Sequence, residues 1–158
     1  MAYVLCSRRE EATISHDTPL ELVVLAIRHF IPSCLSDPPR SEQGSQSLLE
    51  DHYQKEFYRT LYYVTDGRLL TSPEYIVKRG KNGGAIDFFL PSPQWGVELV
   101  RDGNNIDEHM SRFQTGGQYH SLLVSNKMAD YIVLNFTRKS LMKKRPGMSI
   151  ALSLRNRV

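Results

Sequence analysis

The stretch GGAIDFFLPSPQWGVELVRDG, residues 83–103, predicts two apolar strands joined by a proline-containing turn, and therefore a fold with a sheet at its core. AIDFFL and WGVELV are both rich in the β-branched and aromatic residues that strands favour. With the turn centred on the Ser-Pro pair at 92–93, Asp87 and Glu98 become directly opposed neighbours. Side-chain alternation then predicts one shared apolar face, made of Ile86, Phe88, Leu90, Trp95, Val97 and Leu99.

Two carboxylates on the opposite face need an explanation. Asp87 and Glu98 are expected there together with Phe89 and Val100. Opposed like charges destabilise a sheet by about 0.2–1 kcal/mol when exposed, and by more when buried. A divalent cation reverses this penalty, because Mg²⁺ and Mn²⁺ accept carboxylates, waters and phosphate oxygens as ligands. The alternatives are that one acid meets solvent while the other pairs with Arg101 or the VKRGK segment, or that a shifted turn separates the acids.

The other elements follow from local signals. DTPLELVVLAIRHF predicts a helix capped by Asp17 or Thr18 and ending near Phe30. The Ser- and Pro-rich residues 33–47 predict a flexible loop. Further along the chain we expect the elements that periodicity indicates: a helix from SLLEDHYQKEFYRTLYYV, a strand around EYIVKR, the hairpin, a helix carrying Ile106, Met110 and Phe113 that ends at glycines 116–117, and a buried strand DYIVLNF.

This order of helices and strands favours an α/β layer structure. A chain of 158 residues is the size of one domain. We therefore expect a single unit over residues 1–158, with a lead-in at 1–16, a core from about 48 to 136 and a basic C-terminal segment at 137–158. Within that segment, SIALSL is expected to form a final strand or a short helix.

The net charge of +3 is small, but the basic residues are concentrated in two stretches. VKRGK contributes Lys78, Arg79 and Lys81. TRKSLMKKRPG contributes Lys143, Lys144 and Arg145 among others, and is also compatible with a nuclear-import signal. Each stretch is either a solvated loop or a patch that faces the phosphates of a nucleic acid.

The cysteines and the N-terminus predict an intracellular protein. The chain has two cysteines, which form neither a disulfide framework nor a metal knuckle. The N-terminus lacks the charged-then-apolar plan of a signal peptide. The longest apolar run, LELVVLAI, is too short to cross a bilayer, so no membrane segment is expected.

Glu56 falls on the apolar stripe of the helix predicted from SLLEDHYQKEFYRTLYYV. A buried acid is costly unless a partner compensates it. The structural alternative is that Glu56 caps a helix or forms a salt bridge with a neighbouring basic group. Trp95 and the phenylalanines of the hairpin are expected in the core.

Several of these segments resemble a known family. EDHYQKEFYRTLY, the hairpin, EHMSRF with its following GGQY, and DYIVLNF are similar to the PD-(D/E)xK restriction-endonuclease-like superfamily. They resemble in particular the C-terminal nuclease-like domain of Crinkler (CRN) type effector proteins and their fungal relatives. The similarity runs from about Leu48 to Phe136, and WGVELVRDG and EHMSRF are its most specific parts. It implies an αβββαβ core, a mixed sheet flanked by helices, here preceded by an extra N-terminal helix.

The resemblance also implies metal-dependent cleavage of nucleic-acid phosphodiester bonds. Asp87 and Glu98 would be the metal-binding carboxylates for Mg²⁺ or Mn²⁺, and Glu56 a supplementary helix acid. The lysine that the superfamily places two residues after the second acid is Val100 here, which puts catalysis in doubt. Candidate basic substitutes are Arg101, His109 and Arg112. Of these, His109 lies closer to the apolar stripe of its helix, either as a base or as a structural residue.

Gln118 and Tyr119 are candidates for contacting a phosphate or stacking on a base, with packing as the alternative for Tyr119. Three functions remain open. The first is a metal-dependent nuclease acting on DNA or RNA, with DNA preferred. The second is a catalytically inactive nuclease-like module that binds nucleic acid. The third is a domain that binds a host nuclear protein, because the Crinkler resemblance implies effector biology in a host nucleus.

Overall fold

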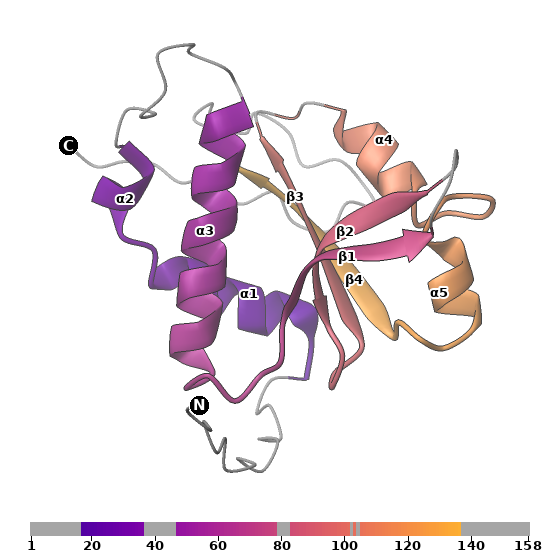
Figure 1. The fold of residues 1–158 in the computed structure, drawn as a ribbon, viewed down its shortest axis with the longest axis horizontal. Helices are drawn as coiled ribbons and strands as arrows, with labels where there is room; N and C mark the ends of the chain where they lie inside the picture. The colour runs from indigo at the N-terminus through magenta and orange to yellow at the C-terminus, as the bar shows by residue number, and fades with distance from the viewer. Residues whose placement is uncertain (1–16, 37–46, 79–82, 102, 104, 137–158) are drawn as a thin grey trace, which may run out of the picture.

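A four-stranded mixed sheet organises the chain (Figure 1). The computed structural model describes residues 17–36, 47–78, 83–101, 103 and 105–136. The strands lie side by side in chain order: β1 (Ser72–Lys78), β2 (Gly84–Leu90), β3 (Trp95–Arg101) and β4 (Asp130–Phe136). The first three strands form an antiparallel meander, and β4 pairs with β3 in parallel.

Helices cover both faces of this sheet. They are, in chain order, α1 (Pro19–Arg28), α2 (Pro32–Ser36), α3 (Ser47–Val64), α4 (Ile106–Ser111) and α5 (His120–Val124). From α3 onward, the order is helix, three strands, helical connection, strand. This confirms the α/β fold with a mixed sheet, is compatible with the expected αβββαβ-type core, and includes the extra helix α1 before it.

The hairpin has the predicted register. Phe88 pairs with Val97, and Leu90 pairs with Trp95. The turn between them closes through a hydrogen bond from Gln94 N to the carbonyl oxygen of Pro91. Trp95 is 7% exposed, so the prediction that it lies in the core is confirmed.

Two apolar layers sandwich the sheet. The first lies between the sheet and α1 and α3, and it contains Phe57, Leu61, Phe88 and Val97. The second lies under α4, α5 and the turn between them, and includes Tyr119. β4 contributes to both layers, because Ile132 and Leu134 lie in the first and Val133 in the second. This confirms that DYIVLNF is buried on both faces, as is usual for a strand with helices on either side.

Local signals position α1 as predicted. Thr18 is the N-cap, and its Oγ1 accepts a hydrogen bond from Glu21 N at 3.3 Å. Pro19 occupies the first turn, where its missing N–H costs nothing. None of the helices in the described part of the chain combines the length and apolar character that a membrane span requires.

Two predicted boundaries are wrong. The helix expected to reach the glycines at 116–117 ends at Ser111, because the chain turns sharply and Tyr119 N donates to the carbonyl oxygen of Arg112 at 2.7 Å. A β-carbon at Gly117 would overlap the carbonyl oxygen of Ser111, so this turn requires glycine. The loop expected at 33–47 begins as helix α2. Its remainder at 37–46, the lead-in at 1–16 and SIALSL lie outside the described residues.

Candidate active site

Asp87 lies where β2 separates from β3. The backbone ladder between these strands reaches Phe88 and Val97. At the next position the side chain takes over, since Asp87 Oδ2 accepts a hydrogen bond from Leu99 N at 2.7 Å. The carboxylate therefore lies against the peptide bond that follows Glu98, in agreement with the predicted opposition of the two acids.

The separation of the strands also changes the face of Ile86. Alternation predicted that Ile86 lies with Phe88, but it belongs to the layer under α4 and α5, with Phe89 and Val100. The prediction is wrong because β2 no longer pairs with β3 beyond Phe88, so β2 twists independently and stays paired with β1 through Tyr75.

Glu98 is the most enclosed acid of the site, at 1% exposed. Its Oε2 lies 2.8 Å from Nδ1 of His109 and 3.6 Å from Nη1 of Arg112. Because an ionised carboxylate only accepts hydrogen bonds, His109 Nδ1 carries the proton and donates it. Within the described residues, the second oxygen, Oε1, is buried and has no hydrogen-bond partner.

His109 and Arg112 both come from the end of α4, the segment EHMSRF. His109 points inward as predicted. Arg112 was expected to lie off the inward face, yet it reaches Glu98 as well, because α4 has ended at Ser111 and Arg112 is its C-cap. Arg112 also bonds Glu108 on the surface, with Nη2 and Oε1 3.1 Å apart. Two basic groups thus lie at the acid beside which the expected lysine is missing.

The lysine position itself is closed. Val100 is 3% exposed and packs in the layer under α4 and α5. Arg101 is the last residue of β3 and is half-buried. Neither is among the residues that contact Glu98 through a salt bridge.

A pocket of about 300 Å³ opens beside Asp87, between α3 and the strands β1 and β2. Asp87 Oδ1 accepts a hydrogen bond from Gln54 Nε2 at 3.3 Å, so this acid faces α3 while Glu98 faces α4. The pocket is lined by residues that sequence reasoning missed, namely Asp51, Gln54, Lys55, Tyr58, Pro73 and Glu74. A signal was present, because the four α3 residues recur at the i, i+3, i+4, i+7 spacing of one helix face.

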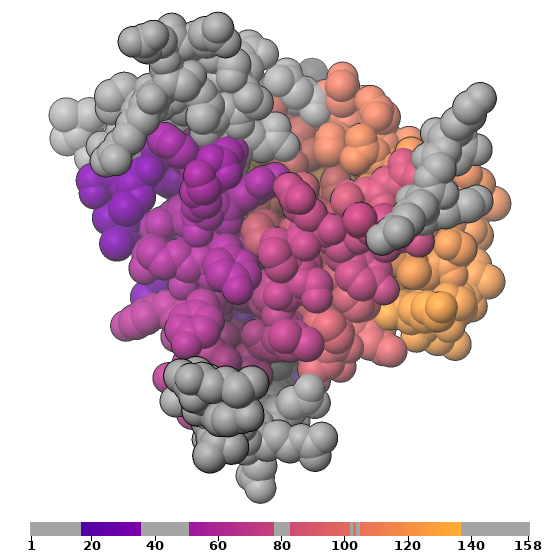
Figure 2. All heavy atoms as spheres, viewed as in Figure 1, coloured from indigo at the N-terminus to yellow at the C-terminus, as the bar shows by residue number. Residues whose placement is uncertain are grey.

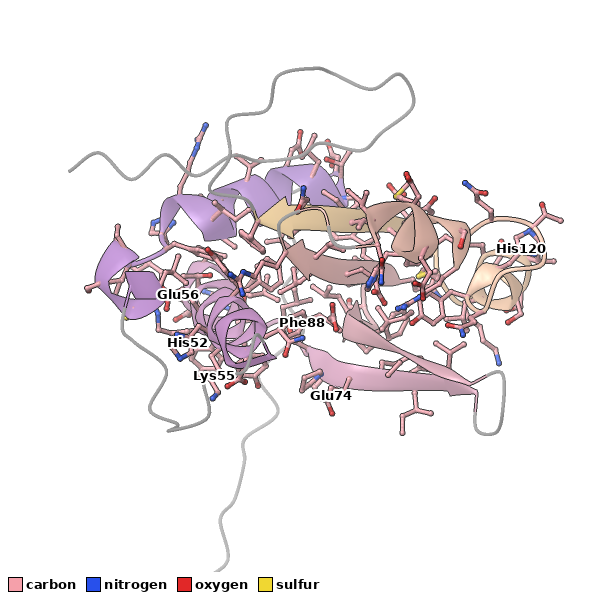
Figure 3. The ribbon with its side chains drawn as sticks, turned by 90° about the horizontal axis from the view of Figure 1, so that it is seen from above. His52, Lys55, Glu56, Glu74, Phe88 and His120 are labelled. Atoms are coloured by element: carbon pink, nitrogen blue, oxygen red, sulfur yellow. The ribbon has the colours of Figure 1, made fainter. Side chains whose placement is uncertain are left out.

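Glu56 does not line this pocket. It is 4% exposed and accepts hydrogen bonds from Nε and Nη2 of Arg59, at 2.8 and 2.6 Å, and from Ile31 N at 2.6 Å. Figure 3 shows Glu56 on the side of α3 that faces α2, with Phe88 on the opposite, strand side. The bond to Arg59 is the main reason that the pKa of Glu56 lies below its usual value. The structural alternative is confirmed, since Glu56 ties α3 to the connection after α1.

Tyr119 is also structural. It is fully buried, and its Oη donates to the carbonyl oxygen of Ala85 at 2.7 Å. Burial, with Glu98 nearby, raises the pKa of Tyr119 to about 12. Gln118 is exposed, and its Oε1 lies over Gly84. Only Gln118 of this pair presents a side chain to a ligand.

The two basic stretches lie largely outside the described residues. Arg79 and Lys81 fall in the gap before β2, and Lys143, Lys144 and Arg145 follow the last described residue. The backbone of Lys78 ends β1, but its side chain is likewise not described. Their part in nucleic-acid binding stays a prediction.

The donor set suits one hard cation with few protein ligands. Among the described residues, no group of three or more His, Cys, Asp and Glu side chains could hold a metal ion. Mg²⁺ needs one or two carboxylates, because waters and substrate phosphates complete its shell. The buried Oε1 of Glu98, which lacks a partner in the described structure, is such an oxygen, and Asp87 lies against the adjoining peptide bond.

Comparison with known proteins adds no relative. No protein-family model, curated protein or solved structure matches this chain. The case for a function therefore depends on the site itself.

Proposed function

We propose that this chain is a nuclease-like domain that hydrolyses phosphodiester bonds of DNA or RNA with a divalent cation, Mg²⁺ or Mn²⁺, held by Asp87 and Glu98. The observation that carries the proposal is the buried Oε1 of Glu98, which has no hydrogen-bond partner among the described residues. An unsatisfied buried acceptor is costly, and a bound cation removes that cost. When bound, the cation would stabilise negative charge that develops on the phosphate.

The protein's own groups hold the two acids in place. The N–H of Leu99 fixes Asp87, and His109 fixes Glu98 through Oε2, which leaves Oε1 for the cation. Groups that orient metal ligands in this way commonly matter 10- to 100-fold for metal affinity or activity. Arg112 supplies permanent positive charge next to Glu98, in the role that the superfamily gives to its lysine: to neutralise charge on the reacting phosphate.

A second candidate is an inactive nuclease-like module that binds nucleic acid or a host nuclear protein. Two observations favour it. Val100 fills the lysine position with a buried apolar side chain. Glu98 already has the cationic partner Arg112. In this case the acids persist as part of the fold, and function depends on what the surface binds.

Calorimetric titration of Mg²⁺ and Mn²⁺ into the wild type, Asp87→Asn and Glu98→Gln separates the two candidates. Each protein is then incubated with plasmid DNA and structured RNA. Binding and cleavage by the wild type, both lost in the two variants, are the expected results. Asp17→Asn is the matched control, because Asp17 is an exposed carboxylate ahead of α1 and lies outside the site.

A wild type that binds neither metal removes the nuclease proposal. DNA binding that falls steeply with salt, without metal-stimulated cleavage, would establish the second candidate. Failure to bind nucleic acid at low salt would leave the protein-binding form of that candidate.

A further inference from the structure

The pocket between α3 and β1 has the wrong charge for a phosphate. Its walls carry the carboxylates of Asp51, Glu74 and Asp87. Lys55 also lines the pocket, but it is already paired with Asp51. An anionic ligand would be repelled here, whereas a neutral ligand with N–H donors finds several acceptors.

One wall of the pocket is an exposed aromatic ring. Tyr58 is 45% exposed, and its inner side stacks on Phe88, with ring centroids 6.4 Å apart and an interplanar angle of 23°. Phe88 holds the Tyr58 ring from beneath, so the other side of the ring remains a flat platform. Figure 2 views the molecule from the side on which α3 and β1 lie next to each other.

The acceptors are held in place by the chain. Gln54 uses Nε2 on Asp87, which leaves its Oε1 as an acceptor. Glu74 stands opposite Asp87 in the β1–β2 register, between the Pro73–Phe88 and Tyr75–Ile86 pairs. Its φ of 49° is in the left-handed region, an unusual conformation for a residue other than glycine inside a strand. Strained backbone of this kind often accompanies binding sites.

We propose that this pocket binds an unpaired nucleobase that carries an exocyclic amino group, stacked on Tyr58, next to the phosphodiester bond that Asp87 helps to cleave. The stacking surface, the neutral interior of the base and the carboxylate acceptors match one another. Carboxylates accept from the amino group of cytosine, and aromatic side chains stack on the bases of single strands. The subsite rests on the proposed function, since it names the substrate class as single-stranded or locally unpaired nucleic acid.

The test uses nucleosides, which have no phosphate. Cytidine and uridine are titrated separately into the full chain in the presence of a chelator, and binding is followed by NMR chemical shifts. Cytidine is expected to bind at least about fivefold more tightly than uridine, because the two differ at the amino-bearing edge of the ring. Tyr58→Ala is expected to weaken cytidine binding at least about fivefold through the loss of stacking.

Two further variants make the test specific. Tyr62→Ala is the control, because Tyr62 is a 60% exposed tyrosine on the same helix and does not line the pocket. It is expected to bind cytidine like the wild type. Glu74→Gln is expected to narrow the preference for cytidine over uridine by replacing an acceptor pair with an amide.

Equal affinity for the two nucleosides, no shift with cytidine, or an unchanged Tyr58→Ala variant would overturn the subsite. These outcomes do not bear on metal binding or cleavage, because the nucleosides contain no bond to cleave and the chelator removes the metal. Conversely, a protein that binds cytidine but never cleaves nucleic acid keeps the base pocket and loses the proposed nuclease activity.

Discussion

The carboxylate of Asp87 accepts a hydrogen bond from the backbone N–H of Leu99 at 2.7 Å, and this bond ties β2 to the strand that carries Glu98. A side chain thus replaces the ladder bond that the diverging strand no longer offers. The same acid has a structural and a proposed catalytic role.

Those two roles can be separated by substitution. Asp87→Ala leaves the buried N–H of Leu99 unsatisfied, and we expect it to lower the free energy of unfolding by about 1–3 kcal/mol. Asp87→Asn retains an acceptor oxygen and should lose less, while both variants lose metal binding. Urea unfolding and calorimetry check this. Equal destabilisation by the two variants would contradict the role of the Leu99 bond.

His109 should act through the orientation of Glu98. We expect His109→Ala to weaken metal binding or cleavage by about 10- to 100-fold, while His109→Gln, which retains a donor, recovers part of the loss. Metal titrations and cleavage rates provide the measurement. His29→Ala, at an exposed helix end, is the control. No rescue by His109→Gln would argue against a positioning role.

Restoring the lysine of the superfamily pattern should fail. Val100 is buried in the layer under α4 and α5, where a lysine has no water and must be desolvated. We expect Val100→Lys to lower the free energy of unfolding by about 2–4 kcal/mol without raising the cleavage rate. Val124→Lys, at a position 69% exposed, should be nearly neutral. A stable, more active Val100→Lys protein would mean that the position opens to the site.

Glu56 should matter for stability and not for cleavage. Its pKa is lowered from 4.5, mainly by the hydrogen bond with Arg59, so its contribution to stability is present above pH 4.5 and is lost as the pH falls through the lowered value. We expect wild type to exceed Glu56→Gln in unfolding free energy at neutral pH, and the difference to close in acid. Urea unfolding at several pH values measures it. Loss of cleavage by a folded Glu56→Gln protein would return this residue to the site.

Tyr119 should be among the last tyrosines to ionise. Burial first, and then Glu98, raise its pKa from 10.0 to about 12, so its neutral phenol stabilises the fold fully below pH 10 and less as the pH rises through about 12. Tyr119→Phe loses the bond to Ala85, which we expect to cost about 0.5–1.5 kcal/mol at neutral pH. The absorbance of tyrosinate in both proteins is the readout. An unchanged high-pH titration in Tyr119→Phe would refute the assignment.

The site was only partly predictable. The opposed positions of Asp87 and Glu98 follow from turn chemistry, because a short turn fixes the register of a hairpin. That Asp87 faces α3 while Glu98 faces α4 does not follow, since it depends on where β2 leaves β3. The pairing of Glu56 with Arg59 and the backbone of Ile31 depends on how the connection after α1 folds back onto α3, a contact between residues far apart in the sequence.

The sequence by itself determined the elements governed by neighbours along the chain. The Thr18 cap, the hairpin turn and the continuous apolar run of β4 are all local or periodic signals. Tertiary structure alone decided the early end of α4, the face taken by Ile86 and the buried oxygen of Glu98. Each of these depends on packing between distant segments, where steric fit and desolvation outweigh the weak preferences of single residues.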